Sequence, residues 1–529
     1  MTLSSGSVMG RITRSTGIVM ASVLLSRILG FFRDWTVAHQ IGSNASTDAY
    51  YAAFTLPDFL NYLVAGGSLS LIFIPVLTKY LAEGPEAEAW HVFSTVLTFM
   101  GLVLVVLVIL AEALAPHLVQ IIAPGFGAAE KARVVFLTRL MMPAQICFYL
   151  GGALAAVQYA KAQFVVPSLA PIVYNLGIIL GGVLLSSRLG ITGFSVGVLA
   201  GALFGNFGLQ IYGARRAGAR FHPNLDLRHP GFRLFLKLAI PIMLALSLVF
   251  TDDWVIRWFG SYLRPASITW LNYGKTLMRV PLGVVGQAVG VASFPFLARL
   301  YSEGRFEELG RTLDSTLRGL ILLLVPISAL TMAESRPLVR LFFAHTKLGP
   351  SDLDATAATL VLFSLGMFAW GAQSIVARGF YAARDTLTPA VTGTLLAVLN
   401  LPVYALLVRR LEHLGLALAS SIGISVYTAV LFGLLARRLP QYDAWPIIAF
   451  FLKIAGLSAV SGLATWQITK WLGTHWGWGS TFGAFLVSSV ATAAGGLITL
   501  ALARAFAVEE LRALFQTASP AANSVSKLA

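Results

Sequence analysis

The chain has 529 residues and a formal net charge of +15, yet only 12% of its residues are charged and 57% are hydrophobic. A soluble domain carries about twice this share of charged residues, and the alternating pattern of a membrane β-barrel is absent. The composition therefore excludes a sizeable soluble domain. Apolar segments of about 20 residues recur along the whole chain and predict bilayer-spanning helices, so the expected fold class is an all-α polytopic membrane protein.

About fourteen transmembrane helices follow one another in the sequence. They are expected at residues 16–40, 48–80, 90–115, 131–158, 165–187, 191–212, 233–257, 268–299, 312–333, 355–382, 388–409, 414–436, 446–470 and 480–505. The apolar segment 336–346 is too short to cross. Residues 1–15 are expected to be a cytosolic tail and not a signal peptide, because charged residues interrupt the first apolar stretch and no cleavage site follows. Residues 507–529 are expected to be a second cytosolic tail.

Three sequence anchors recur with nearly the same offset. The segment from Pro75 to Gly84 returns as Pro295 to Gly304, Asp34-Trp35 returns as Asp253-Trp254, and the pair Tyr159 and Pro167 returns as Tyr381 and Pro389. The pattern predicts two six-helix repeats, an N-lobe at 16–212 and a C-lobe at 233–438, plus two C-terminal helices at 439–506. An even number of spans per repeat gives both repeats the same membrane orientation, a parallel duplication typical of transporters.

The basic residues of the loops gather on one side of the predicted membrane. The strongest cluster is Arg215, Arg216, Arg220, Arg228 and Arg233, in and beside the linker 213–232 that joins the two repeats. The positive-inside rule then places this linker and both termini in the cytoplasm. Basic loops beside anionic membrane lipids account for the net charge, so a nucleic-acid partner is not expected.

The first span carries charges that hydrocarbon does not tolerate. Ser26 and Arg33 are seven residues apart and share one helix face, as do Arg27 and Asp34, with Gly30 between them. These faces must meet protein or a water-filled cavity. One interpretation is an internal Arg–Asp pair that holds helices together. The other is a cationic lining for an anionic ligand, since guanidinium groups bind two phosphate oxygens at once.

Carboxylates mark the seventh span. Asp252 and Asp253 are adjacent, and Arg257 follows Asp253 by one helical turn. Either Asp253 lies near the interface or pairs with Arg257, or the carboxylates bind a cation or proton that couples transport to an ion gradient. Sodium or the membrane potential is the expected driving force, with Asn400 of the eleventh span as a weaker partner, and no other cofactor is expected.

Two corresponding spans contain helix-breaking residues. The eighth span carries Lys275 and Arg279 before a run of prolines and glycines, and the second span carries Pro57, Asp58 and the Gly66-Gly67 pair. Broken helices in matching positions of two repeats point to a substrate site. Lys275 and Arg279 are therefore candidates to line it, the alternative being side chains that reach the membrane interface.

Several motifs resemble the MurJ (MviN) family of the multidrug/oligosaccharidyl-lipid/polysaccharide exporter superfamily. They are Ser26-Arg-Ile-Leu-Gly-Phe-Phe-Arg-Asp34, Thr47-Asp-Ala-Tyr-Tyr-Ala-Ala-Phe54 with Pro57, Pro281-Leu-Gly-Val-Val-Gly286, and Gly379-Phe-Tyr-Ala-Ala-Arg-Asp-Thr386. The resemblance covers nearly the whole chain. It implies a V-shaped, two-lobed transporter of the bacterial inner membrane with a central cationic cavity. The family's cavity residues correspond here to Ser26, Arg27, Arg33, Asp34 and Asp48.

The resemblance also implies a substrate. This is lipid II, an undecaprenyl-pyrophosphate-linked disaccharide-pentapeptide, moved from the inner to the outer leaflet by alternating access, with spans thirteen and fourteen forming a groove for its tail. The alternative is a flippase for another undecaprenyl-linked glycan, or an ion-coupled exporter of the same superfamily. The transporter is expected to act as a monomer among membrane lipids. No enzyme is expected, since the sequence contains no phosphate-binding glycine loop and no plausible catalytic triad.

The chain departs from the family pattern at four places. Thr55 replaces a lysine, the region of Asn61 and Tyr62 replaces a basic residue, and Gly66 replaces a glutamate. The usual basic residue of the eighth span falls at Thr276, which leaves Lys275 and Arg279 as the neighbours that would compensate. A cavity with fewer charges would alter the binding pose or the glycan that is carried.

Overall fold

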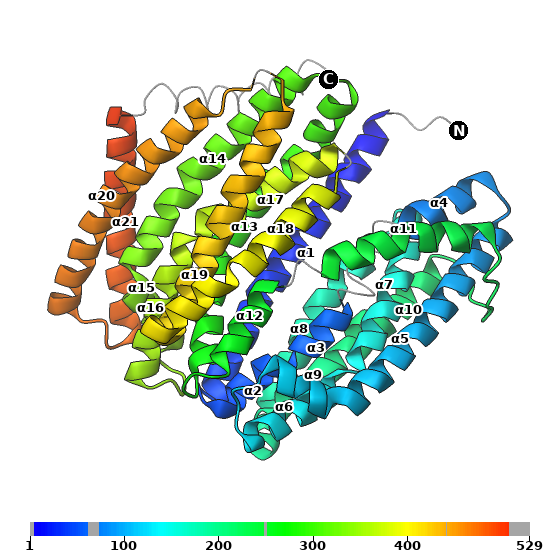
Figure 1. Cartoon of the computed structure of the whole chain (residues 1–529), viewed down its shortest axis with the longest axis horizontal. Coiled ribbons are helices and arrows are strands. Elements are labelled where there is room, and N and C mark those ends of the chain that lie inside the picture. Colours follow the sequence, from blue (N-terminus) through cyan, green and yellow to red (C-terminus); the bar gives the residue numbers. More distant parts are fainter. Residues whose placement is uncertain (1–4, 62–72, 248–250, 384, 441, 507–529) are drawn as a thin grey trace. The chain divides into compact units, whose positions relative to one another are not determined.

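The computed structural model describes residues 5–61, 73–247, 251–383, 385–440 and 442–506. In these ranges the chain forms helices and no strand (Figure 1). Contacts divide the chain into two compact units, Met1–Thr269 and Trp270–Ala529. The seventh span therefore packs with the first unit, although the sequence repeat assigns it to the second. The predicted repeat boundary rests on the recurring sequence motifs, whereas the unit boundary reflects packing.

The first unit contains the spans of the first repeat together with span seven. Its helices are α1 (Ser5–Gln40), α2 (Ala45–Ala53), α3 (Thr55–Leu60), α4 (Ile74–Glu83), α5 (Glu86–Ile122), α6 (Ala128–Met141), α7 (Ala144–Ala160), α8 (Val165–Leu189), α9 (Thr192–Gly201), the π-helical η3 (Ala202–Gly208), α10 (Leu209–Arg216), α11 (Pro230–Ser247) and α12 (Thr251–Gly260). Because α1 already begins at Ser5, most of the expected tail 1–15 continues the first helix.

The second unit follows from the beginning of span eight. Its helices are α13 (Ser267–Ser302), whose first turn still belongs to the first unit, α14 (Phe306–Ala333), α15 (Ser335–Phe343), α16 (Pro350–Leu365), α17 (Met367–Ala382), α18 (Leu387–Leu399), α19 (Leu401–Arg438), α20 (Trp445–Trp476) and α21 (Thr481–Phe506). The short helix α15 coincides with the apolar segment that was expected not to cross the membrane.

The helices agree with a polytopic membrane protein of about fourteen spans. In the described part of the chain, eight helical segments are long and apolar enough to cross a membrane, and the pair α16–α17, bent by 40°, adds a ninth. Of the five remaining expected spans, α1 and α13 carry charges, and residues 48–80 and 233–257 include stretches outside the described residues. The eleventh span is divided between the short α18 and the beginning of α19. Glu412, with φ 49° and ψ −130°, breaks α19 between the eleventh and twelfth spans.

Small residues allow α8 and α9 to pack backbone against backbone. Gly177 and Gly181 on α8 face Gly197 and Gly201 on α9, each pair four residues apart and hence on one helix face. A Cβ atom on Gly197 would lie 2.6 Å from the carbonyl oxygen of Gly177, and one on Gly181 would lie 2.5 Å from the Cα of Gly197. Any larger side chain here would force the two helices apart.

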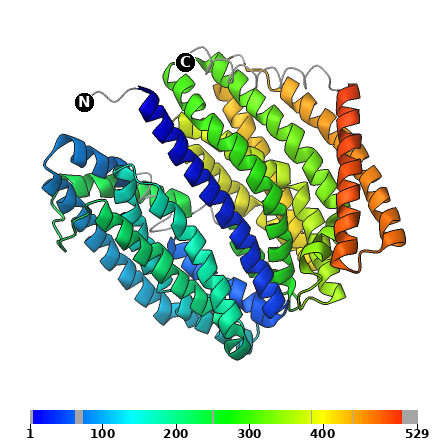
Figure 2. The ribbon, with the colours of Figure 1, turned by 180° about the vertical axis from the view of Figure 1, so that it is seen from behind.

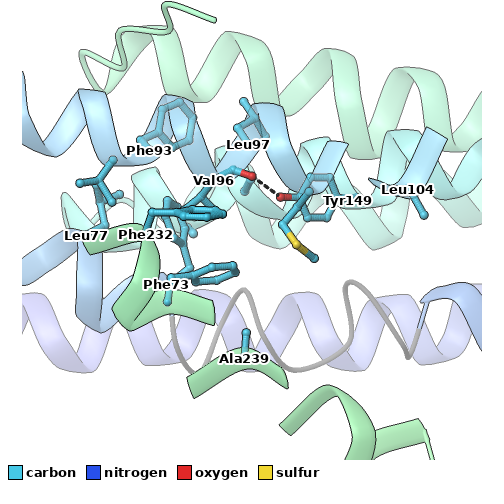
Figure 3. Close-up of a cluster of buried hydrophobic side chains, with 14 of the residues drawn as sticks. Phe73, Leu77, Phe93, Val96, Leu97, Leu104, Tyr149, Phe232 and Ala239 are labelled. Atoms are coloured by element: carbon cyan, nitrogen blue, oxygen red, sulfur yellow. Dashed lines mark hydrogen bonds between the residues drawn. The ribbon is translucent and has the colours of Figure 1, made fainter. Parts of the chain in front are cut away.

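An aromatic core joins α11 to the first unit (Figure 3). Phe232 lies fully buried beside Phe73 and Phe93, and the hydroxyl of Tyr149 donates to the carbonyl oxygen of Val96 at 3.2 Å. Burying an aromatic side chain contributes about 1.5–3 kcal/mol. This packing explains why the start of span seven belongs with the helices of the first repeat.

The linker between the repeats lies against the beginning of α5. His91 Nε2 is 3.2 Å from Asp226 Oδ2, and His229 Nε2 is 3.6 Å from Glu88 Oε1. The hydrogen bond to His91 lowers the pKa of Asp226. The carboxylate therefore favours this contact while it is ionised, and the contribution disappears as the pH falls through its lowered pKa.

Large apolar side chains remain exposed along the last two helices, which lie side by side in the second unit (Figure 2). Leu463 on α20 is 65% exposed, and Leu497 and Leu500 on α21 are 68% and 64% exposed. Contiguous apolar surface of this kind is costly in water. Hydrocarbon is the solvent that these faces require, as the hydropathy of the spans predicts.

Candidate functional site

The charged residues of α1 differ in how far they are buried. Nε and Nη2 of Arg33 both donate to Asp34 Oδ1, at 3.1 and 3.0 Å. Asp34 is 3% exposed, whereas the side chain of Arg33 keeps 28% of its surface accessible. Arg27 is exposed. The Arg–Asp pair seen here joins neighbouring residues of one helix and does not by itself hold two helices together. Both arginines keep accessible surface.

The stretch of α1 from Ser22 to Gly30 packs on α8. Nδ2 of Asn175 lies 3.4 Å from Ser26 Oγ, and a Cβ on Gly30 would lie 4.0 Å from Asn175 Oδ1. Ser22 adds a hydrogen bond to the carbonyl oxygen of Ser168. Asn175 thus lies against Gly30, and Ser26 takes part in the packing of α1 on α8.

A second arginine reaches this region from span seven. Nη1 of Arg257, on α12, donates to Thr55 Oγ1 at 3.0 Å and lies 3.5 Å from Asp58 Oδ2. The rings of Phe59 and Trp254 meet edge to face at 5.2 Å. These contacts hold α12 against α3.

The charges from the three helices form one electrostatic cluster in the first unit. Asp58 interacts electrostatically with Arg257, Asp253 and Arg33. We call Arg33, Asp34, Asp58, Asp253 and Arg257 the charged cluster. It combines two cations with three carboxylates, and Arg27 adds an exposed cation on the same helix as Arg33. The contact between Asp58 and Arg257 could not be predicted from the sequence, because no periodicity links residues so far apart in the chain.

Arg257 supplies a positive charge beside Thr55, which is itself uncharged. The resemblance leads us to expect a lysine at position 55, and here a guanidinium group from α12 lies on the threonine hydroxyl instead. At the second departure, Nδ2 of Asn61 donates to Gln145 Oε1 on α7 at 3.1 Å. Tyr62 and Gly66 lie outside the described residues.

This substitution of one cation for another is testable. Arg257→Ala is expected to weaken transport and to lower stability by about 1–2 kcal/mol, because Asp58 loses a charged hydrogen-bonding partner. Adding Thr55→Lys should restore both properties, since the ammonium group would lie beside Asp58. Thr55→Met is the uncharged control. Equal rescue by lysine and methionine, in thermal unfolding and in a growth assay, would show that the charge is irrelevant.

Asp48 has a structural partner of its own. Its Oδ1 accepts hydrogen bonds from the backbone nitrogen and from Oγ1 of Thr269, at 2.8 and 2.6 Å, and the residue is only 1% exposed. Thr269 lies in the first turn of α13, where unpaired N–H groups and the helix dipole favour a negative charge. Asp48 therefore closes the N-terminus of span eight.

The two basic candidates of α13 differ in their surroundings. Lys275 is 5% exposed, and its Nζ lies 5.3 Å from the ring centre of Trp370 and 5.7 Å from that of Phe363. Such cation–π contacts stabilise a buried ammonium group. Arg279, one turn later, is exposed, and Thr276 lies between them in sequence. Of these two cations, Arg279 is the one whose residue lies at the protein surface.

The candidate coupling residues are distributed over both units. Asp252 and Asp253 belong to α12 in the first unit, and both are partly exposed. Asn400 belongs to the second unit, where it ends α18 and its Nδ2 donates to the carbonyl oxygen of Ala419 at 3.0 Å. The structure thus groups Asp253 with Asp58 and Arg257. It gives Asn400 a role in joining α18 to α19.

Two apolar hollows adjoin one another in the second unit. The larger hollow, of about 930 Å³, is lined from α14, α15, α16 and α20, and the smaller one, of about 450 Å³, from α14, α16, α17, α19 and α20. They share Ala329, Met332 and Ala459. Span thirteen (α20) therefore lines both hollows, whereas α21 contacts α20 without lining either of them.

Solved structures share this arrangement of helices. A structure described as lipid II flippase MurJ in an inward closed conformation matches with a TM-score of 0.77, at 22% identity, over 93% of this chain and 99% of its own. An inward-facing multidrug resistance MATE family transporter of the MOP superfamily matches with a TM-score of 0.60, at 12% identity, over 80% of this chain and 98% of its own. This chain therefore shares the fold of these two transporters.

Sequence comparison defines the family within that class. The model of the family described as lipid II flippase MurJ matches residues 37–487. A probable lipid II flippase MurJ of Vibrio cholerae is 28% identical over 94% of this chain and 95% of its own length, and a lipid II flippase MurJ of Burkholderia cenocepacia is 27% identical over 85% and 88%. The chain belongs to the lipid II flippase MurJ family. Membership in a family of flippases agrees with the prediction that it is not an enzyme.

Proposed function

We propose that this protein carries lipid II across the membrane, moving the undecaprenyl-pyrophosphate-linked disaccharide-pentapeptide from the inner to the outer leaflet by alternating access. The observation that carries this proposal is the pair of accessible arginines, Arg27 and Arg33, at membrane depth in α1. Charges there are expensive unless they face a polar ligand or water. A pyrophosphate supplies the oxygens that guanidinium groups bind in pairs.

Genetic replacement tests this function. Cells depleted of their own lipid II flippase should grow when they express this chain, and lipid II should stop accumulating on the inner side. Purified protein in liposomes should make fluorescent lipid II accessible from outside. Rescue without movement of lipid II, but with movement of another undecaprenyl-linked glycan, would favour the alternative substrate. The departures at Thr55, Asn61 and Thr276 are the observation behind that alternative.

The smaller hollow suits the apolar tail of such a substrate. Its lining is almost wholly apolar, with Leu317 and Ile321 on α14 and Phe368, Phe432 and Phe451 on the helices around it. A saccharide-pyrophosphate head requires a polar path, whereas an undecaprenyl chain requires a dry one. Protein helices on both sides of the tail would keep it near the head group during the crossing.

Sodium or the membrane potential is proposed to drive transport, with Asp252 and Asp253 as the coupling residues. Carboxylate oxygens suit a hard cation, and Asp253 belongs to the same charged cluster as Arg33. Equal transport with and without a sodium gradient, at zero potential, would reject sodium coupling.

The protein is further proposed to act as a monomer in the bacterial inner membrane with both termini in the cytoplasm. The basic linker supports this orientation through the positive-inside rule. Cysteines introduced at positions 218 and 43 in a Cys147→Ser background separate the two topologies. Only the cysteine at position 43 should react with a membrane-impermeant reagent applied outside the cell.

A further inference from the structure

The larger hollow has a charged rim that the transport mechanism does not use. Arg336 at the start of α15 and Lys470 on α20 lie on this rim, together with one carboxylate, Asp354 on α16. Nε of Arg336 is 3.8 Å from Asp354 Oδ1, and Nη2 of Arg340 lies 4.0 Å from the same oxygen. One carboxylate is therefore shared by two arginines, and Lys470 adds a further cation. The rim carries an excess of positive charge.

The rim cations are accessible and only weakly held. The side chain of Arg336 is 65% exposed and that of Asp354 is 51% exposed. Exposed ion pairs of this kind contribute little, so Arg336 can exchange the carboxylate for a more strongly charged anion. Nζ of Lys470 lies 5.6 Å from the ring centre of Trp466, at the mouth of the same hollow.

The floor of the larger hollow is apolar and continuous with a longer groove. Met332, Ala357, Val361, Gly462 and Leu463 form much of this floor. It adjoins the smaller hollow, which extends along α14 as far as Leu317. The sixteen residues from Leu317 to Met332 span about 22 Å, at a rise of 1.5 Å per residue. The charged rim can therefore bind an anionic head group while the apolar groove binds the extended chain attached to it.

Tryptophans place the rim at the level of a membrane interface. Trp466 and Trp478 line the larger hollow, and Trp471 and Trp476 lie at the same end of α20, 58% and 53% exposed. Tryptophan is enriched where hydrocarbon meets the head groups. Cations at this level meet lipid phosphates.

We propose that the larger hollow is a binding site for an anionic glycerophospholipid of the surrounding membrane. Its phosphate lies against Arg336 and Lys470, and one acyl chain lies on the apolar floor. Pockets of about 300–1,000 Å³ hold drug-sized ligands, so about 930 Å³ accommodates a phosphate head and part of a chain but not a disaccharide-pentapeptide. The proposal is independent of the transport substrate, because it concerns binding of a membrane lipid alone.

Lipid retention by the purified full chain tests this site. Native mass spectrometry after exchange into mixed micelles of phosphatidylglycerol and phosphatidylcholine should show a preference for phosphatidylglycerol. The double variant Arg336→Gln, Lys470→Gln should bind phosphatidylglycerol about tenfold more weakly. The matched control is Arg409→Gln, Arg410→Gln, which removes two exposed charges outside both hollows. It should retain the preference.

A second variant separates the chain from the head group. Ala358→Trp fills the floor while leaving the rim charges in place, and it too should weaken lipid retention. Thermal unfolding of each variant verifies that the protein is folded. An unchanged preference in the rim variant would overturn the proposal, as would an equal loss in the control pair, which would indicate a net-charge effect. Full displacement of the lipid by inorganic phosphate would identify a free anion site instead.

Discussion

Arg33→Gln is expected to abolish transport, and neutralising its partner Asp34 as well is expected to restore the fold but not the transport. Nε and Nη2 of Arg33 both donate to Asp34 Oδ1, and Asp34 is nearly fully buried. Removing one partner of a buried ion pair costs about 3–5 kcal/mol. The single variant should therefore lose stability as well as activity.

The double variant Arg33→Gln, Asp34→Asn separates these two effects. Both charges disappear together, so its unfolding temperature should return close to that of the wild type, while the cation for a pyrophosphate is still missing. Thermal unfolding in detergent and growth of flippase-depleted cells measure the two properties. Recovery of growth by the double variant would mean that Arg33 serves only to neutralise Asp34. Arg27→Gln is the comparison, because Arg27 is exposed and its loss should reduce transport with little change in stability.

Asp48→Ala should destabilise the protein by about 2 kcal/mol, because two hydrogen bonds at the start of α13 are lost and Thr269 keeps two donors without an acceptor. Asp48→Asn should cost about half as much, since the amide oxygen still accepts. Transport should fall only in proportion to the amount of folded protein.

Thr269→Val distinguishes the structural role of Asp48 from direct substrate binding. This variant removes the hydroxyl donor and keeps the backbone donor, so it should reproduce part of the stability loss. Thermal unfolding and lipid II binding by the remaining folded protein are the measurements. Lost binding in Asp48→Asn with unchanged stability would instead support the cavity role that the family resemblance implies.

The sequence predicted the features that depend on neighbouring residues. Hydrophobic length defined the spans, and the break at Glu412 lies between the expected eleventh and twelfth spans. Four-residue glycine spacing was also present in the sequence of α8 and α9, although only the structure shows which glycines face each other. An Arg–Asp pair that holds helices together was one of two interpretations of the first span, whereas the pair seen in the structure joins the adjacent residues Arg33 and Asp34 of one helix.

Long-range partners could not be predicted in the same way. Arg257 and Asp58 belong to different predicted repeats, and the sequence around each residue does not indicate that the two are in contact. Lys275 was a candidate for a polar site, but its neighbours Phe363 and Trp370 come from α16 and α17. A sequence gives the charge of a side chain, whereas the fold decides whether rings, carboxylates or solvent surround it.

The packing of span seven with the first unit has a consequence for dividing the molecule. A fragment that ended at the repeat boundary, residue 232, would lack Phe235 and Ala239 from the aromatic core and would leave Asp58 without Arg257. A fragment that ended at residue 269 would keep these contacts and the cap on Thr269. The predicted sequence repeat and the packing of the helices therefore divide this chain at different residues, and split or circularly permuted versions should be divided at the packing boundary.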